Sequence, residues 1–127
     1  MGQKKSIVIV DDDVDVSQMT RMRLEQTGLY SVRVCNRGSE AVSVLREVKP
    51  DMVLLDIVMP DADGTEIARQ IQEDKSLAGT RIVFMTSLVE EGELSQSSMI
   101  GGHPFISKPI TGEALLESVR KFFDIGH

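Results

Sequence analysis

The stretch Ile7-Val8-Ile9-Val10-Asp11-Asp12-Asp13 is an apolar run that ends on three aspartates. A short, nearly continuous apolar run is typical of a strand that a parallel sheet buries on both faces. Three further apolar runs each lead to a polar side chain: Met52–Leu55 to Asp56, Ile82–Met85 to Thr86, and Phe105–Ile106 to Lys108. In an open parallel sheet these four ends lie along one edge, where such sheets bind their ligands.

Those strand ends bring at least three carboxylates, a hydroxyl and an ammonium group into one crevice. Carboxylates at such short range repel one another unless a cation lies among them. The sequence therefore predicts a bound metal ion at the carboxyl edge of the sheet.

Length and composition predict a single domain over residues 1–127, because the chain of 127 residues can bury a sizeable core. The net charge of −6 argues against direct binding of nucleic acid, which requires a basic surface. No apolar stretch is long enough to cross a bilayer, so we expect no membrane contact and a cytoplasmic location. Cys35 is the only cysteine and is expected to be a small buried hydrophobe rather than a reactive thiol.

Apolar runs alternate with helical patterns, which predicts an α/β fold built from repeated strand–helix units. The expected strands are residues 6–10, 31–35, 52–56, 81–86 and 104–107. Residues 31–35 alternate polar and apolar side chains, which indicates an edge strand. The implied arrangement is a doubly wound, five-stranded parallel sheet of order 2-1-3-4-5, flavodoxin-like, with helices on both faces.

Helical periodicity indicates which side chains each helix buries. The expected faces and ends are Val16, Met19, Thr20, Leu24 and Thr27 with a stop at Gly28; Ala41, Val42, Leu45 and Val48 before Lys49-Pro50; Ile67, Ala68 and Ile71 after a cap at Asp63; and Leu115, Leu116, Val119, Phe122 and Phe123 after a cap at Thr111. Residues 90–100 form the weakest expected helix, because serine and glycine are poor in helix interiors.

Other interpretations of the first acidic loop fit less well. A calcium-binding loop would need glycine where Val16 stands and a bidentate glutamate where Met22 stands. The segment from Asp13 to Ser17 is similar to the nucleophile motif of haloacid-dehalogenase-type phosphatases, in which the first aspartate attacks phosphate. Asp13 or Asp15 also suits a simple helix N-cap, and we expect Asp61 and Asp63 to belong to a turn.

Four motifs stand in order along the chain: Val10-Asp11-Asp12, Leu54-Leu55-Asp56 followed by Met59-Pro60 and Asp63-Gly64, Phe84-Met85-Thr86-Ser87, and Ser107-Lys108-Pro109. This ordered set resembles the receiver domain of two-component response regulators, the CheY-like family, over essentially the whole chain. Each motif alone is weak, whereas the ordered set at these spacings is specific.

The resemblance implies a phosphoacceptor signalling domain rather than an enzyme that turns over an external substrate. The implied roles are phosphoacceptor for Asp56; Mg²⁺ ligands for Asp11, Asp12, Asp56 and the backbone carbonyl of Val58; phosphoryl contacts for Thr86 and Lys108; and switch residues for Thr86 and Phe105. The implied partners are a histidine kinase or phosphotransfer protein, an effector domain or downstream protein, and a second copy of the chain. The signal would leave through the fourth helix, fifth strand and fifth helix, where Phe122 and Phe123 suggest a homodimer.

One segment departs from the pattern of the family. Gly101-Gly102-His103-Pro104-Phe105 stands where the family often has Gly-Ala, two polar residues and an aromatic. Pro104 removes a backbone donor at the start of the fifth strand, and Phe105 lacks the hydroxyl of the frequent tyrosine. These changes leave the phosphorylation site intact and affect only how the signal leaves it.

Two other classes of function remain open at this point. The chain could be a binding module that uses the receiver fold without phosphorylation, although the intact site residues argue against this. A flavodoxin-like cofactor binder shares the topology, but the acidic first loop would repel a flavin phosphate.

Overall fold

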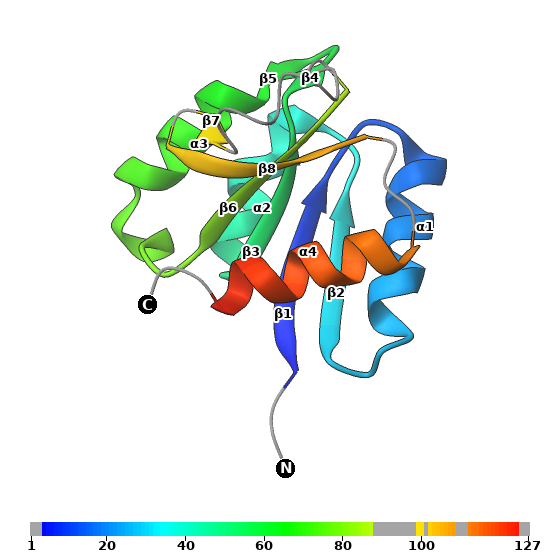
Figure 1. Cartoon of the computed structure of the whole chain (residues 1–127). Helices are drawn as coiled ribbons and strands as arrows, with labels where there is room; N and C mark the ends of the chain where they lie inside the picture. Colours follow the sequence, from blue (N-terminus) through cyan, green and yellow to red (C-terminus); the bar gives the residue numbers. More distant parts are fainter. Residues whose placement is uncertain (1–3, 88–98, 101, 109–111, 125–127) are drawn as a thin grey trace.

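The computed structural model describes residues 4–87, 99–100, 102–108 and 112–124, which form a central sheet covered by helices on both faces (Figure 1). The strands are β1 (Lys5–Val10), β2 (Tyr30–Cys35), β3 (Met52–Asp56), β4 (Val58–Met59), β5 (Ala62–Asp63), β6 (Arg81–Thr86), β7 (Met99–Ile100) and β8 (His103–Ser107). The helices are α1 (Val14–Glu25), α2 (Ala41–Val48), α3 (Gly64–Glu73) and α4 (Gly112–Asp124), with short 3-10 turns η1 (Gly38–Glu40) and η2 (Lys75–Leu77).

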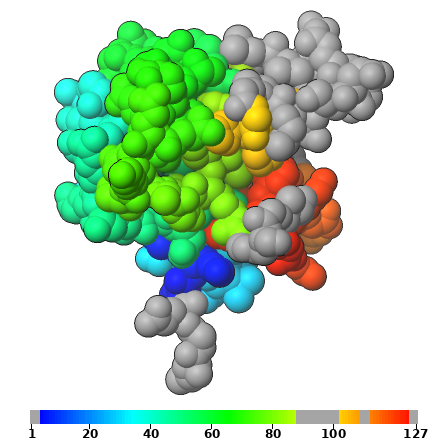
Figure 2. Space-filling view, turned by 90° about the vertical axis from the view of Figure 1, so that its left-hand side faces the viewer, coloured from blue at the N-terminus to red at the C-terminus, as the bar shows by residue number. Residues whose placement is uncertain are grey.

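Five parallel strands lie in the order β2-β1-β3-β6-β8, which confirms the predicted 2-1-3-4-5 topology and the edge position of β2. The two-residue strand β7 extends the sheet antiparallel to β8, and part of β8 shows at the surface between the green and red segments of the chain (Figure 2). The predicted helix over residues 90–100 is therefore wrong for Met99 and Ile100, which pair as a strand with β8. The rest of that prediction, residues 90–98, lies outside the described residues.

The sheet separates two apolar layers. Helices α2 and α3 cover one face, where Leu45 and Ile71 pack with Val8, Leu55 and other buried strand residues. Helices α1 and α4 cover the opposite face, where Leu24 and Val119 pack against Ile9 and its neighbours. Residues 7–10 of β1 and 52–55 of β3 are fully buried on both faces of the sheet, which explains their continuous apolar sequences.

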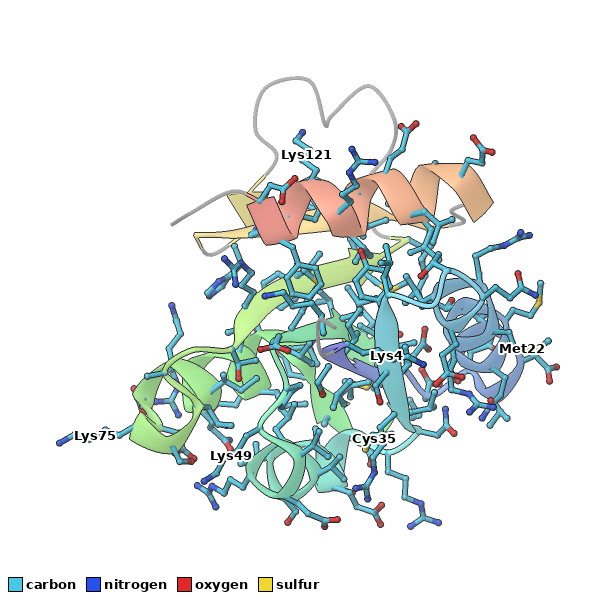
Figure 3. All side chains as sticks on the ribbon, turned by 90° about the horizontal axis from the view of Figure 1, so that it is seen from below. Lys4, Met22, Cys35, Lys49, Lys75 and Lys121 are labelled. Carbon is cyan, nitrogen blue, oxygen red and sulfur yellow. The ribbon has the colours of Figure 1, made fainter. Side chains whose placement is uncertain are left out.

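Helix α1 turns a different face to the sheet from the one that its apolar residues predict. Met19 is 70% exposed and Val16 is 37% exposed, whereas Ser17, Thr20 and Leu24 are buried. The two hydroxyls can be buried because each donates a hydrogen bond to a carbonyl of its own helix, at 3.0 Å for Ser17 and 2.8 Å for Thr20. The expectation for Val16 and Met19 is therefore wrong, and the neighbouring Met22 also points outward (Figure 3).

Local chemistry fixes the ends of the other elements. Asp63 caps α3 by accepting from the Thr65 amide at 2.8 Å, as predicted. Lys49, with φ 50°, ends α2 before Pro50, and the proposed cap Thr111 lies outside the described residues.

Cys35 is buried, as expected. Among the described helices, none has the length and apolar run that crossing a bilayer would require.

Candidate functional site

Three aspartates meet at the carboxyl edge of the sheet. Asp11 follows β1, Asp56 ends β3, and these parallel strands are in register with Val10 beside Leu55. Asp11, Asp12 and Asp56 each offer a carboxylate oxygen, and these oxygens lie within 4.8 Å of one another. Asp11 and Asp56 are buried while Asp12 is exposed, so the cluster is anchored in the protein and open to solvent on one side.

Lys108 reaches this cluster from the end of β8. Its Nζ atom lies 2.7 Å from Asp11 Oδ2 and 3.4 Å from Asp56 Oδ2. The Lys108 amide donates to the Thr86 carbonyl at 2.8 Å, which ties the residue after β8 to the end of β6. The predicted convergence of Asp11, Asp12, Asp56 and Lys108 is therefore present in the fold.

The electrostatics of the cluster follow from burial and from these pairings. Burial raises the pKa of Asp56 and the charge of Asp11 raises it further, while the Lys108 charge and a backbone hydrogen bond from Val58 lower it. Burial acts to lower the pKa of Lys108, but its hydrogen bond to Asp11 and the two carboxylate charges outweigh burial and raise it. Lys108 therefore remains a cation at neutral pH.

The donor set fits a hard divalent cation. All three side chains offer oxygen ligands, which Mg²⁺ prefers, and the exposed Asp12 leaves room for the water ligands that Mg²⁺ retains. Three carboxylates and the ammonium group of Lys108 carry two net negative formal charges. One Mg²⁺ would balance these two charges.

The remaining predicted residues lie around the cluster. Thr86 ends β6, is 1% exposed, and pairs in register with Ser107 of β8. Phe105 is buried in the layer beneath α2 and α3, beside Phe84 of β6. Val58 starts the β4–β5 hairpin two residues after Asp56, the last residue of β3, and is 59% exposed.

Asp13 is not part of the carboxylate cluster. It is the N-cap of α1 and accepts from the Val16 amide at 3.0 Å, which satisfies a donor that the helix would otherwise leave free. This geometry supports the helix-cap interpretation and argues against Asp13 as a phosphatase nucleophile.

Two polar residues near the site were given no functional role from the sequence: Asn36 was not singled out, and Asp61 was expected only to belong to a turn. Asn36 donates from Nδ2 to the Asp11 carbonyl at 2.7 Å and to Ser17 Oγ at 2.9 Å. Asp61 accepts from the amides of Gly38 and Ser39, both at 3.1 Å. The only sequence signal for these contacts is that Asn36 directly follows a strand and Asp61 lies in a Pro/Gly-bounded turn.

Comparisons with known proteins agree with the geometry. The signature of the response regulator receiver domain matches residues 7–120. The polar-differentiation response regulator DivK of Brucella anthropi is 29% identical over 118 residues, covering 93% of this chain and 95% of DivK. The solved CheY-like receiver domain protein of Methanospirillum hungatei is 27% identical with a TM-score of 0.80, covering 96% of this chain and 95% of that one.

A more distant solved structure supports the fold alone. The chemotaxis protein CheY4 of Vibrio cholerae superposes with a TM-score of 0.81 at 22% identity, covering 94% of this chain and 99% of CheY4. The strand order, the acidic cluster beside Lys108 and the matched signature all lead to one assignment. This chain belongs to the response regulator receiver domain family.

Proposed function

We propose that the chain accepts a phosphoryl group on Asp56 and uses the resulting aspartyl phosphate as a signal in a two-component pathway. The single observation that carries the proposal is the position of Lys108 Nζ, 2.7 Å from Asp11 and 3.4 Å from Asp56, within a three-carboxylate cluster. An ammonium group at this distance can neutralise charge on a group attached to Asp56.

The phosphodonor is a phosphohistidine on a histidine kinase or phosphotransfer protein, or a small acyl phosphate. One Asp56 carboxylate oxygen forms the new P–O bond while the P–N or P–O bond of the donor breaks, and the bonding electrons stay on the leaving atom. The Lys108 ammonium group, 3.4 Å from Asp56 Oδ2, favours the ionised form of this carboxyl group, and the carboxylate is the attacking group.

The side chains of the cluster divide the work. Asp11, Asp12, Asp56 and the Val58 carbonyl would hold Mg²⁺, which when bound supplies positive charge for the transferring oxygens. Lys108, which follows β8, orients and neutralises the phosphoryl group, and the Thr86 hydroxyl at the end of β6 donates to it. These assignments make catalysis a matter of positioning and electrostatics.

The proposed switch lies in strands β6 and β8. A phosphoryl group that binds Thr86 and Lys108 adds new contacts at the ends of β6 and β8, and Phe105 responds in the layer beneath. The output is contact with an effector domain or a downstream protein.

The proposed homodimer uses α4, the fifth helix expected from the sequence, and only one of its two phenylalanines. Phe123 is buried and stacks on Tyr30 with ring centroids 5.8 Å apart, so it belongs to the core. Phe122 is only partly buried and is the apolar side chain of the pair that α4 leaves accessible. Sedimentation with and without phosphodonor, on wild type and Phe122→Ser, tests this step.

The proposed phosphorylation is tested by intact mass spectrometry after incubation with acetyl phosphate. Wild type with Mg²⁺ should gain the mass of one phosphoryl group, and EDTA or Asp56→Asn should prevent the gain. A partner whose affinity is the same for wild type and Asp56→Asn, with and without phosphodonor, would instead support a binding module without phosphorylation.

A further inference from the structure

The segment between β2 and α2 contacts both loops that carry the proposed metal ligands. On one side, the half-buried Asn36 uses its amide group to donate to the Asp11 carbonyl at 2.7 Å and to Ser17 Oγ at 2.9 Å. Ser17 is fully buried in the first turn and a half of α1. One side chain therefore joins the start of the β1–α1 loop to helix α1, which follows that loop.

On the other side, the same segment holds the hairpin that follows Asp56. The amides of Gly38 and Ser39 donate to the two carboxylate oxygens of Asp61, each at 3.1 Å. Gly38 lies so close to the hairpin that a Cβ there would be 2.5 Å from the Cβ of Ala62. The segment is therefore packed against the β4–β5 hairpin as well as bonded to it.

The two loops joined in this way both carry proposed metal ligands. Asp11 and Asp12 lie in the first loop, and Val58, two residues after Asp56, starts the hairpin in the second. The Asp11 amide also donates to the Cys35 carbonyl at 3.1 Å, so backbone and side chain of adjacent residues both fix the first loop. A ligand set that must hold an octahedral ion depends on such a fixed spacing.

We propose that Asn36 is a positioning residue of the phosphorylation site: its two hydrogen bonds hold the loop of Asp11 and Asp12 at a set distance from the hairpin that Asp61 fixes to Gly38 and Ser39. This inference rests on the proposed function, because it assigns Asn36 to the geometry of the same metal site. Asn36 touches neither the phosphoryl group nor the ion and acts through Asp11 and Asp12.

The test compares Asn36→Ala with Thr80→Val. Thr80 is a matched control because its Oγ1 donates to the Pro50 carbonyl at 2.8 Å, across a comparable separation along the chain. Both residues lie near the amino ends of the strands, away from the carboxylate cluster. Each purified protein is stripped with EDTA and titrated with MgCl₂ by calorimetry. Amide hydrogen exchange of residues 11–17 is measured on the metal-free proteins.

Asn36→Ala should weaken Mg²⁺ binding about 10-fold, as is typical when a partner that orients metal ligands is lost. It should also raise exchange of the Asp13 amide, which donates to Asp11 Oδ1 at 2.9 Å. Phosphorylation by acetyl phosphate should return to the wild-type rate at saturating Mg²⁺, so only the Mg²⁺ concentration for half-maximal rate rises. Thr80→Val should leave all three quantities at wild-type values.

The outcomes separate the two proposals. Wild-type Mg²⁺ affinity and exchange in Asn36→Ala would overturn the positioning role and leave the proposed function standing. An equal weakening in Thr80→Val would also overturn it, because general loosening would then explain the effect. A wild-type protein that neither binds Mg²⁺ nor gains a phosphoryl group would remove the proposed function and this inference with it. If Asn36→Ala does not fold, Ser17→Ala removes one of the two acceptors and is measured in the same way, with a smaller shift expected.

Discussion

The backbone of Gly64 lies directly against the carbonyl oxygen of Asp56. A Cβ added at Gly64 would be 2.2 Å from that oxygen and 2.7 Å from the Ile57 Cα, and the Gly64 amide donates to the Ile57 carbonyl at 2.8 Å. The start of α3 therefore supports the strand end that carries the proposed phosphoacceptor. Glycine is needed here for the close approach of the two backbones and not for its conformation, since the φ of Gly64 is not in the left-handed region.

Gly64→Ala should displace the Asp56 backbone or the start of α3, because the clash is with main-chain atoms that cannot rotate away. We expect a loss of about 2–3 kcal/mol in the free energy of unfolding, as for other overpacked sites, and a lower rate of phosphorylation. Urea unfolding and intact mass spectrometry measure the two effects.

Gly79→Ala is the matched control, since nothing lies within 4 Å of a Cβ at Gly79. It should leave the phosphorylation rate unchanged and the stability within about 1 kcal/mol of wild type. Equal effects of the two substitutions would contradict the proposed contact between Gly64 and Asp56.

Lys108→Met removes the cation beside two buried carboxylates. Asp11, with its side chain 2% exposed, loses the 2.7 Å pairing, so we expect a loss of about 3 kcal/mol in metal-free protein. Added Mg²⁺ should recover part of that loss and stabilise the variant more than wild type, because the Lys108 ammonium group no longer repels the ion. Denaturant unfolding with and without Mg²⁺ measures both effects.

Lys75→Met makes the same change of charge at an exposed position in η2 (Figure 3). It should cost less than about 0.5 kcal/mol and leave the response to Mg²⁺ unchanged. A Lys108→Met protein as stable as Lys75→Met in EDTA would show that the buried pairing contributes nothing.

The face that α1 turns to the sheet is tested by two substitutions. Met19→Gln changes a side chain that is 70% exposed and should alter the free energy of unfolding by less than about 0.5 kcal/mol. Leu24→Ala removes a fully buried side chain and should cost about 2–5 kcal/mol. The reverse ranking in denaturant unfolding would mean that Met19, and not Leu24, faces the core.

Sequence patterns predicted the sheet and most of the site because they reflect burial. The runs ending at Asp11, Asp56 and Thr86 are buried on both faces, so their apolar sequences locate the strands and the polar residues mark their ends. Parallel pairing then brings those ends together without further information.

The parts that sequence did not predict depend on polar contacts. Ser17 and Thr20 are buried because their own helix satisfies their hydroxyls, which a hydrophobicity pattern does not reveal. Asn36 meets Asp11 and Ser17 only after folding, across 25 and 19 residues of chain. The β4–β5 hairpin is too short for a strand pattern.

Asp74 provides a pH-dependent test away from the acidic cluster. Its carboxylate accepts from the hydroxyl and amide of Ser76, at 2.7 and 2.9 Å, and pairs with Arg46 at 2.7 Å. The Ser76 hydroxyl and then Arg46 lower the pKa of Asp74 from 3.8 to about 2. A lowered carboxyl pKa means that the unfolded chain binds the proton more readily than the folded protein.

The stabilisation from Asp74 is therefore complete above the unfolded pKa of 3.8 and is lost as the pH falls towards about 2. Asp74→Ala should be less stable than wild type at neutral pH, and the difference should shrink between about pH 4 and pH 2. Urea unfolding of both proteins across this range measures the difference. A gap that stays constant down to the lowest pH would contradict the role of the ionised carboxylate.

Locating the phosphoryl group on the chain identifies the phosphoacceptor residue. Borohydride reduces an aspartyl phosphate to homoserine, which peptide mass spectrometry assigns to a position. After treatment of wild type with acetyl phosphate and Mg²⁺, homoserine should appear at position 56, and EDTA should prevent it. Homoserine at position 13, or at no position in protein that has bound Mg²⁺, would contradict the assignment of Asp56 as the phosphoacceptor.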